Sequence, residues 1–309
     1  MANAATQIQI REIEKIAELK TVEELQREIW GCSDLEVLPS LALIPLLEIG
    51  GVLLGAFDNE QLIGFALGFP GVEDARLILH SDMLAVKQEY RSQDVGFTLK
   101  LAQRERALAK GIERITWTFD PLQSRNAHLN FAKLGVIADR YRINYYGETS
   151  SFLHRTGTDR LWVTWHVNSD RVRNRLRDVS APTNDCRGVP PWAPPGPEGN
   201  GPPESKLPKP STVLLEVGDN DEPVSNKRPF DNEAIIEIPH DINRILSDNM
   251  ELAVRWREET RQAFTIAIDA GLSVQEFCRP GKNERNVGRY LLLRKQDDPR
   301  NHTKQHEIG

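Results

Sequence analysis

The sequence has few cysteines, and this scarcity excludes several kinds of protein. Cys32, Cys186 and Cys278 lie far apart and are odd in number, so they form neither a disulfide framework nor a paired zinc-ligand pattern. A reducing compartment fits this use of cysteine, and we expect a cytoplasmic protein. No metal site is expected, because His302 and His306 stand in a polar tail without a third ligand.

A long hydrophobic run is also missing. The most apolar stretch, residues 41–57, is interrupted by Pro45, Glu48, Gly50 and Gly51, whereas a membrane-spanning helix needs about 20 apolar residues with few charges. The N-terminus lacks the apolar stretch of a signal peptide. We therefore expect a soluble chain without a membrane partner, in which residues 41–57 form a loop or helix end and then a buried strand.

Charge of one sign is not concentrated anywhere in the chain. The formal net charge is −6, and acidic and basic residues are mixed along the sequence. Nucleic-acid-binding proteins usually present a basic patch, so no nucleic-acid partner is expected. With 39% hydrophobic and 27% charged residues, the composition is that of a globular protein. A length of 309 residues allows two domains of about 100–200 residues each.

Hydrophobic periodicity predicts alternating strands and helices in the first half. Residues 8–13 alternate like a half-buried edge strand, and Thr21 with Glu24 forms a capping box for an amphipathic helix that ends at Trp30. The later predicted elements are a hairpin (51–57 and 62–68), a strand (75–86), a helix (96–110), a strand (114–119), a helix (125–134) and strands at 138–146 and 160–167. This order predicts an α/β (α+β) fold with a mixed, mostly antiparallel sheet flanked by helices.

A proline-rich stretch separates the two halves. Residues 180–211 contain the run Pro-Pro-Trp-Ala-Pro-Pro-Gly-Pro, which cannot form a regular helix or strand ladder. We therefore assign residues 1–170 to a first domain, 180–211 to a linker or surface segment, and 212–309 to a smaller α/β domain. In that domain, strands are predicted at 212–217, 234–238, 272–278 and 289–294, with a mostly helical region at 241–270.

The two halves share a weak internal repeat. The run Arg125-Asn-Ala stands ten residues before Gly135, and Arg261-Gln-Ala stands ten residues before Gly271. A strand is predicted after each glycine. We interpret the second domain as a degenerate duplicate of the first half; the alternative is chance similarity between two helix–glycine–strand units.

One strand–loop–helix segment carries a candidate binding site. It reads Leu84-Ala-Val-Lys-Gln-Glu-Tyr-Arg-Ser-Gln-Asp-Val-Gly-Phe-Thr-Leu-Lys100. The first amides of a helix have no partner inside the helix, and the helix dipole places partial positive charge there. A loop wrapped on such a helix end, with a small residue that allows close approach, can bind a pyrophosphate.

This segment resembles the acyl-CoA signature of the GNAT superfamily, Arg/Gln-x-x-Gly-x-Gly/Ala. Arg91 matches its first position and Gly96 its last. Residues 115–135 resemble the following strand and helix of the family, with Asn126 at the usual asparagine. The resemblance covers residues 8–167, and it is closest to a subgroup of GNAT acyltransferases with an added C-terminal region.

The resemblance implies an acyl-CoA-dependent N-acyltransferase. In this family the fourth and fifth strands part, and pantetheine lies between them like a strand. The cofactor-binding residues that it implies are Leu84, Ala85 and Val86 for pantetheine, Arg91, Ser92, Gln93, Asp94, Val95, Gly96, Phe97 and Thr98 for the pyrophosphate, and Asn126. An acetyl or another short acyl group, such as succinyl, would pass from acetyl-CoA or another acyl-CoA to the amino group of a small molecule, such as an amino acid. The amine would attack the thioester directly, and the protein would be a monomer or a homodimer.

The sequence departs from the family pattern at two positions. Asp94 replaces the first glycine; aspartate tolerates a left-handed backbone, and its charge either turns to solvent or weakens cofactor binding. Phe131 replaces the usual tyrosine acid and cannot protonate a thiolate. Tyr145, Tyr146 or water would have to do so instead. The alternative function is therefore a degenerate acyl-CoA-binding or scaffold protein.

An attacking amine also needs a base, because it is mostly protonated at neutral pH. His80 and Asp82 are candidates, and the two-residue period of a strand predicts that they share a face with Leu84 and Val86. Glu48, just before the second strand, is another candidate. Each of these residues has the alternative interpretation of a solvated or structural polar group.

Three residues farther along the chain are interpreted mainly as structural. Asp120 precedes a proline and is expected to end a strand, with a contribution to the acceptor pocket as the alternative. Trp162 and Trp165 alternate with valines and are expected to pack within the sheet.

Overall fold

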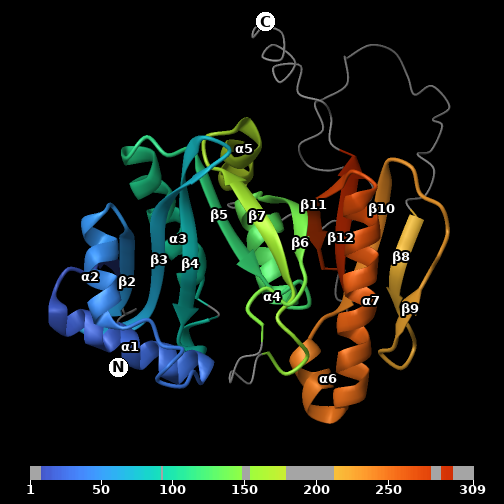
Figure 1. Ribbon diagram of the computed structural model, residues 1–309, viewed down its shortest axis with the longest axis horizontal. Helices are drawn as coiled ribbons and strands as arrows, with labels where there is room; N and C mark the ends of the chain where they lie inside the picture. The colour runs from blue at the N-terminus through green and yellow to red at the C-terminus, as the bar shows by residue number, and fades with distance from the viewer. Residues whose placement is uncertain (1–7, 92, 148–153, 179–211, 280–286, 295–309) are drawn as a thin grey trace, which may run out of the picture.

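The computed structural model describes residues 8–91, 93–147, 154–178, 212–279 and 287–294. These residues form one mixed sheet of 12 strands with helices packed on it (Figure 1). The strand order is β1-β2-β3-β4-β5-β7-β6-β11-β12-β10-β8-β9. The predicted fold class is confirmed, and both halves of the chain contribute to the same sheet. The predicted linker at 180–211 lies outside the described residues, and the division into two domains stays a prediction.

The first half follows the predicted order of elements closely. Its elements are β1 (Gln9–Glu12), α1 (Ile16–Trp30), α2 (Ser40–Glu48), β2 (Val52–Asp58), β3 (Gln61–Glu73), β4 (Arg76–Val86), η1 (Gln88–Tyr90), α3 (Val95–Ala109), β5 (Arg114–Phe119), α4 (Ser124–Ala127), η2 (His128–Leu134, a π-helix), β6 (Ile137–Arg142), β7 (Arg160–His166) and α5 (Asp170–Asp178). Strand β6 ends at Arg142, earlier than predicted, and α5 was not predicted.

The predicted capping box at Thr21 is wrong. Helix α1 begins at Ile16, and the Thr21 hydroxyl donates to the carbonyl of Ala17, 3.4 Å away, inside the helix. The buried face of α1 includes Leu19 and Val22. The helical period therefore extends to the N-terminal side of the threonine.

The second half repeats the topology of part of the first. Its elements are β8 (Thr212–Val217), β9 (Pro223–Ser225), β10 (Glu233–Pro239), α6 (Ile242–Asp248), α7 (Met250–Asp269), β11 (Leu272–Cys278) and β12 (Val287–Arg294). The unit β5, α4, η2, β6, β7 has the sheet order β5-β7-β6, and the unit β10, α6, α7, β11, β12 has the sheet order β10-β12-β11. Gly135 and Gly271, which precede the second strand of each unit, have φ of 72° and 86°. This arrangement matches the predicted internal repeat, whose origin by duplication stays a prediction.

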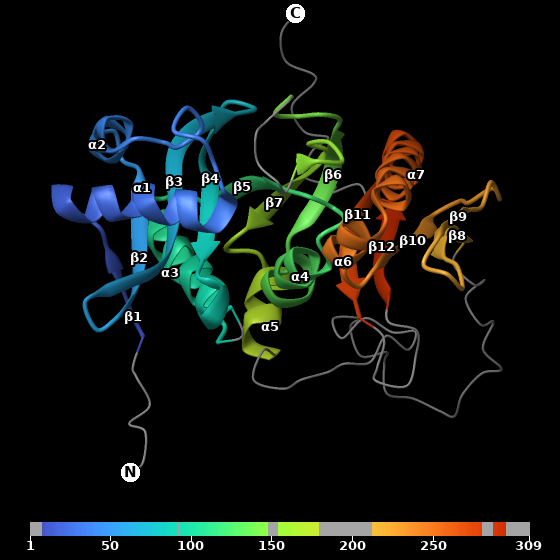
Figure 2. The same cartoon turned by 90° about the horizontal axis from the view of Figure 1, so that it is seen from below.

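The helices are distributed over both faces of the sheet. Figure 2 shows α1, α2 and α7 on one side and α3, α4 and α5 on the other. Helices α1 and α2 bury one cluster of apolar side chains against β2, β3 and β4. A larger cluster spans α3, the central strands and the whole second half. On the first side, Figure 2 shows no described helix over the central strands between α1 and α7.

None of the helices in the described part of the chain is long and apolar enough to cross a membrane.

Candidate functional site

Strands β4 and β5 are hydrogen-bonded only near their starts. Their parallel ladder has two pairs, and the second joins His80 to Thr116. Beyond this point β4 continues to Val86 in register with β3, while β5 continues to Phe119 in register with β7. The two strands therefore part after His80 and Thr116. We call the space between their unpaired halves the strand opening.

A β-bulge lies on β4 where the opening begins. Opposite β3, Met83 pairs with Leu67 and His80 pairs with Phe69. Between these two pairs there are three steps along β4 and two along β3, so β4 has one extra residue, at Ser81 or Asp82. Bulges bend a strand and re-aim its groups, and they are frequent beside active sites.

The bulge also changes which side chains share a face. Met83 and Ala85 pack with the cluster under α1 and α2, whereas Leu84 and Val86 pack with the cluster that contains Leu79. His80, which follows Leu79, points to the opposite face from Leu79. The prediction that His80 and Asp82 share a face with Leu84 and Val86 is therefore wrong, because the bulge shifts the alternation by one residue.

The N-terminus of α3 lies against the end of β4. Asp94 precedes this helix with φ 55° and ψ 18°, and the Thr98 amide donates to the Asp94 carbonyl at 3.0 Å. A Cβ atom on Gly96 would stand 3.7 Å from Leu84 and 3.8 Å from Val86, so glycine or alanine fits there. The helix amides ahead of Thr98 have no acceptor inside the helix, and they lie beside the strand opening.

Asp94 has a cationic partner on a neighbouring helix. Its carboxylate accepts a hydrogen bond of 2.5 Å from Lys133 of η2, and its side chain is 64% exposed. Lys133 also lies 5.6 Å from the centre of the Phe97 ring. The left-handed conformation agrees with aspartate at this glycine position, and Lys133 balances the charge.

Arginine side chains gather around this helix end. Arg91 donates from Nε to the Val86 carbonyl at 3.0 Å, and burial and the nearby charge of Arg125 lower its pKa. Burial and Arg125 also lower the pKa of Arg279, which follows β11. The pKa of His128 falls to about 4 because of burial and the charges of Arg279 and Lys133. Both halves of the chain thus contribute positive charge near the α3 N-terminus, an arrangement that favours an anion.

The other predicted cofactor residues occupy varied environments. Gln93 and Thr98 are exposed, and the Gln93 amide donates to Tyr90. Val95 is buried in the core, and Asn126 is exposed on α4. Ser92 lies outside the described residues. Their roles in binding stay predictions.

His80 lies on the face of the sheet opposite α3, at the start of the strand opening, and its side chain is half-buried. Its Nδ1 is 3.1 Å from the Thr116 hydroxyl, and its ring centre lies 5.7 Å from that of Phe69 and 5.2 Å from that of Trp162. Burial lowers the His80 pKa, with a further decrease from Lys100 and an opposing effect of Asp82. The imidazole is therefore neutral near pH 7 and able to accept a proton.

Asp82 interacts with His80, whereas Glu48 lies on another element, at the end of α2. The Asp82 side chain is exposed, yet surrounding protein raises its carboxyl pKa, with His80 opposing. Its charge also raises the pKa of Tyr145, after the larger effect of burial. Glu48 is exposed at the end of α2. Among the described residues, Glu48 has no recorded contact with the other catalytic candidates.

Aromatic side chains surround His80 on this face. Tyr145 and Tyr146, which are 42% and 47% exposed, lie in ring contact with each other, and Tyr145 also contacts Trp162. The Tyr146 hydroxyl is 3.3 Å from the Thr118 hydroxyl on β5. We define the aromatic surface as Phe69, His80, Tyr145, Tyr146 and Trp162. Trp165 is buried as predicted, whereas Trp162 belongs to this half-exposed surface.

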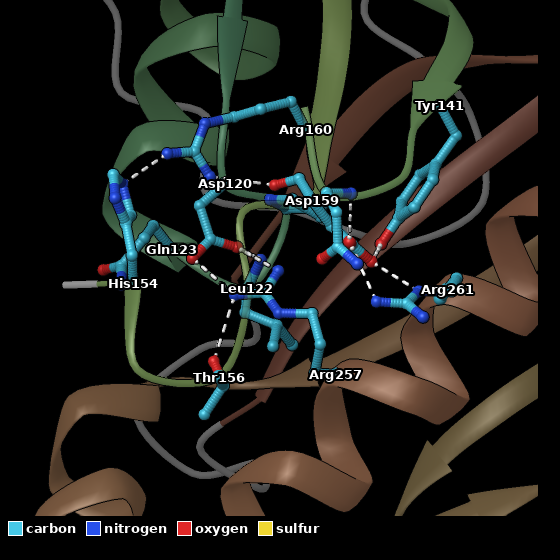
Figure 3. A network of polar contacts seen from close by, with 12 residues as sticks. Asp120, Leu122, Gln123, Tyr141, His154, Thr156, Asp159, Arg160, Arg257 and Arg261 are labelled. Carbon is cyan, nitrogen blue, oxygen red and sulfur yellow. Dashed lines mark hydrogen bonds and ion pairs between the residues drawn. The ribbon is translucent and has the colours of Figure 1, made fainter. Parts of the chain in front are cut away.

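A polar network joins the end of β5 to the second half (Figure 3). Arg257 of α7 donates two hydrogen bonds of 2.7 Å to Asp120. Arg261, one helical turn later, binds Asp159 with distances of 2.8 and 3.0 Å. His154 accepts from Arg160 at 2.7 Å through Nε2, because guanidinium can only donate. Asp120 thus anchors α7, beyond its predicted role of ending a strand.

Phe131 cannot take part in proton transfer. It is fully buried and packs against Phe119 and Tyr290.

Lys100, which was not predicted as a site residue, is buried at the strand opening. A signal for it existed in the sequence, because Gly96, Lys100, Gln103 and Ala107 share one helical face.

Comparison with known proteins identifies the first part of this chain. Residues 19–136 match the model of the Acetyltransferase (GNAT) family. This part of the chain is a GNAT-family domain, and the chain has an additional C-terminal region.

Solved structures of acetyltransferases are also similar to the chain. The ribosomal-protein-S18-alanine N-acetyltransferase from Escherichia coli is 15% identical, with 53% of this chain and 96% of that chain covered and a TM-score of 0.43. A GNAT acetyltransferase from Streptococcus pneumoniae is 20% identical, with 51% and 98% covered and a TM-score of 0.42. A GNAT acetyltransferase from Elizabethkingia anophelis with acetyl-CoA bound is 16% identical, with 52% and 97% covered and a TM-score of 0.38.

No curated protein matches the chain. Within the described residues, no cluster of three or more His, Cys, Asp or Glu side chains is arranged to hold a metal ion.

Proposed function

We propose that the protein transfers an acetyl or another short acyl group, such as succinyl, from coenzyme A to the amino group of a small molecule such as an amino acid. The observation that carries this proposal is the strand opening, which begins at the β4 bulge and lies beside the N-terminus of α3. The same elements would hold an extended chain between the parted strands and offer amides to a diphosphate.

The residues at the opening fit an acyl-CoA. Gly96 leaves close access between α3 and the end of β4, and Arg91, Arg125 and Arg279 supply positive charge nearby. The unpaired edge of β4 at Leu84, Ala85 and Val86 would bind pantetheine through backbone groups. The thioester of a bound acyl-CoA supplies an activated acyl group, and an amide freed by the bulge would polarise its carbonyl.

His80 is the proposed base on the acceptor side. Its lowered pKa keeps the ring neutral, and Asp82 beside it would attract an incoming ammonium group. The amine would enter across the aromatic surface, lose a proton to His80 and attack the carbonyl directly. Tyr146, above β5, would help to orient the acceptor. We propose a monomer or homodimer that works without a metal.

A second candidate function is acyl-CoA binding without catalysis. The observation that favours it is the burial of Phe131 at the family position of the tyrosine acid. The Asp94–Lys133 pair argues against a damaged phosphate site, because the aspartate charge is balanced.

Ligand binding and turnover separate these functions. The full chain should gain thermal stability with millimolar acetyl-CoA or succinyl-CoA, since a ligand at 100 times its Kd adds about 2.7 kcal/mol. Thiol release with a panel of amino acids and other amines should then reveal turnover. Binding without turnover over a broad panel would support the second function, and the absence of binding would contradict both.

A further inference from the structure

Lys100 occupies the apex of the strand opening. The last paired residues of β4 and β5 are His80 and Thr116, and the residues that follow them are Ser81 and Trp117. The Lys100 ammonium donates to the Ser81 hydroxyl at 2.7 Å and lies 3.7 Å from the centre of the Trp117 ring. It therefore bridges the two strands at the position where they separate.

This ammonium group is buried without a countercharge among the described residues. Lys100 is 2% exposed, and its third recorded partner is the neutral Gln103 side chain, at 3.4 Å. Burial lowers its pKa to about 7, and no carboxylate contributes to the shift. Burying an isolated ammonium group costs free energy on folding. A lysine in this position therefore suggests a function that uses its charge or its proton.

Lys100 and His80 reach the opening from opposite faces. Lys100 comes from α3 and donates to Ser81, whereas His80 points to the opposite face, which carries the aromatic surface. If the acceptor amine approaches the thioester from the His80 side, the opposite side of the thioester would face Lys100. Phe131 cannot supply the acid, because its phenyl ring has no proton to donate.

We propose that Lys100 is the acid of the transfer reaction, donating its proton to the coenzyme A sulfur. This inference rests on the proposed function. As the bond between amine nitrogen and carbonyl carbon forms, the carbon–sulfur bond breaks, and its electron pair passes to sulfur. The acceptor ammonium first loses one proton through His80 to solvent; in the transfer step the sulfur takes a proton from Lys100 Nζ, and the nitrogen of the neutral amine gives its second proton to His80. After release of amide and thiol, Lys100 regains a proton from solvent and His80 loses one to it.

Among the described residues, His80 is the titratable group that interacts with the Lys100 charge. From β4 the titratable neighbour is His80, whose pKa Lys100 lowers; the facing groups from β4, α3 and β5 are Ser81, Gln103 and Trp117, which do not titrate near neutrality. An acid must begin protonated, so Lys100 gives a rate that falls as pH rises through about 7. His80, as a base, gives a rate that rises with pH through its own lowered pKa.

The test compares the full-length protein with Lys100→Met and a matched control, Lys110→Met, on the exposed C-terminal end of the same helix. The first readout needs no acceptor: ultraviolet absorbance of the thiolate gives the thiol pKa of bound coenzyme A. We expect this pKa to be about 1 unit or more lower in the wild type and Lys110→Met than in Lys100→Met, because a nearby cation favours thiolate.

Kinetics provide the second readout. In Lys100→Met, kcat should fall by about 10²- to 10⁴-fold, with the Kd for acetyl-CoA within about threefold of the wild type, and the decline in rate above pH 7 should disappear. Lys100→Arg covers the case in which Lys100→Met does not fold. It should keep the low thiol pKa but remain slow, because guanidinium does not release its proton.

Several results would overturn the assignment. If coenzyme A binds and its thiol pKa is the same in the wild type and Lys100→Met, Lys100 does not face sulfur, while the proposed function stands. If Lys100→Arg is as fast as the wild type, Lys100 is not the acid. If the decline in rate at high pH disappears in Tyr146→Phe and persists in Lys100→Met, the acid is Tyr146. If the wild type does not bind coenzyme A, the proposed function and this inference both fail.

Discussion

Arg257 of α7 forms a bidentate ion pair with Asp120 at the end of β5, with both distances at 2.7 Å. The side chains are 3% and 11% exposed. Burial alone would raise the Asp120 pKa, but the charge and hydrogen bonds of Arg257 outweigh it and lower that pKa. The pair joins the GNAT-family domain to the C-terminal half beside the proposed active site.

Removal of Arg257 should therefore destabilise the protein strongly. Arg257→Met leaves a buried carboxylate without its partner, and we expect the free energy of unfolding to fall by about 3–5 kcal/mol. Urea unfolding measures this change, with Arg255→Met, at an exposed position of the same helix, as the control. A loss equal to that of the control would contradict a stabilising role of the pair.

The pH dependence of this effect has a defined sign. Because the folded-state pKa of Asp120 is lowered, its stabilisation is present above the unfolded-state pKa and is lost as pH falls through the folded-state value. The difference between the wild type and Arg257→Met should therefore shrink in acid. A difference that grows on acidification would contradict this account.

Charge removal at Asp94 should strengthen acyl-CoA binding. Asp94→Asn and Asp94→Gly both tolerate the left-handed backbone at φ 55°, and both free the Lys133 ammonium to approach a phosphate. We expect the Kd for acetyl-CoA to fall about three- to tenfold in calorimetry, less at high salt. Weaker binding in both variants would show that Asp94 positions the loop.

Arginines from both halves should contribute to the same phosphate site. Arg125→Gln on α4 and Arg279→Gln after β11 should each raise the Kd for acetyl-CoA about tenfold, or about 1.4 kcal/mol. The effect should diminish with salt because charge attraction causes it. Arg255→Gln is the matched control. An unchanged Kd in Arg279→Gln would exclude the second half from cofactor binding.

His80 should control the acidic side of the pH profile. Burial keeps its pKa below the ordinary value of 6.5, so kcat/KM should rise with pH through a midpoint below that value. His80→Gln should lose this rise and about 10²- to 10⁴-fold of the rate, with acetyl-CoA binding nearly unchanged. Asp82→Asn should mainly raise KM for the amine. A profile unaffected by His80→Gln would exclude the proposed base.

Much of the fold could be predicted because local signals set the element boundaries. Strand β5 was predicted residue for residue, since Gly111 precedes it and Asp120 with Pro121 stops it. The β4 bulge could not be predicted, because it depends on the register with β3 and leaves no mark in the apolar pattern. It reversed the predicted face of His80 relative to Leu84.

The candidate site was predictable only in its local part. Arg91, Asp94 and Gly96 belong to one contiguous motif, so the sequence was sufficient to find the helix end. The partner of Asp94 is Lys133, 39 residues away, and the contribution of Arg279 depends on the packing of the second half. Lys100 was not singled out from the sequence, although its spacing from Gly96 and Gln103 places it on the same helical face as these residues.

The most direct test of the account is hydrogen–deuterium exchange of the full-length protein with and without saturating acetyl-CoA. We expect slower exchange of the β4 amides after the bulge and of the first amides of α3, with strands β8 and β10 as an unaffected internal reference. Bound acetyl-CoA without protection at β4 and α3, or no binding at millimolar concentration, would contradict the proposal that the strand opening receives the acyl carrier.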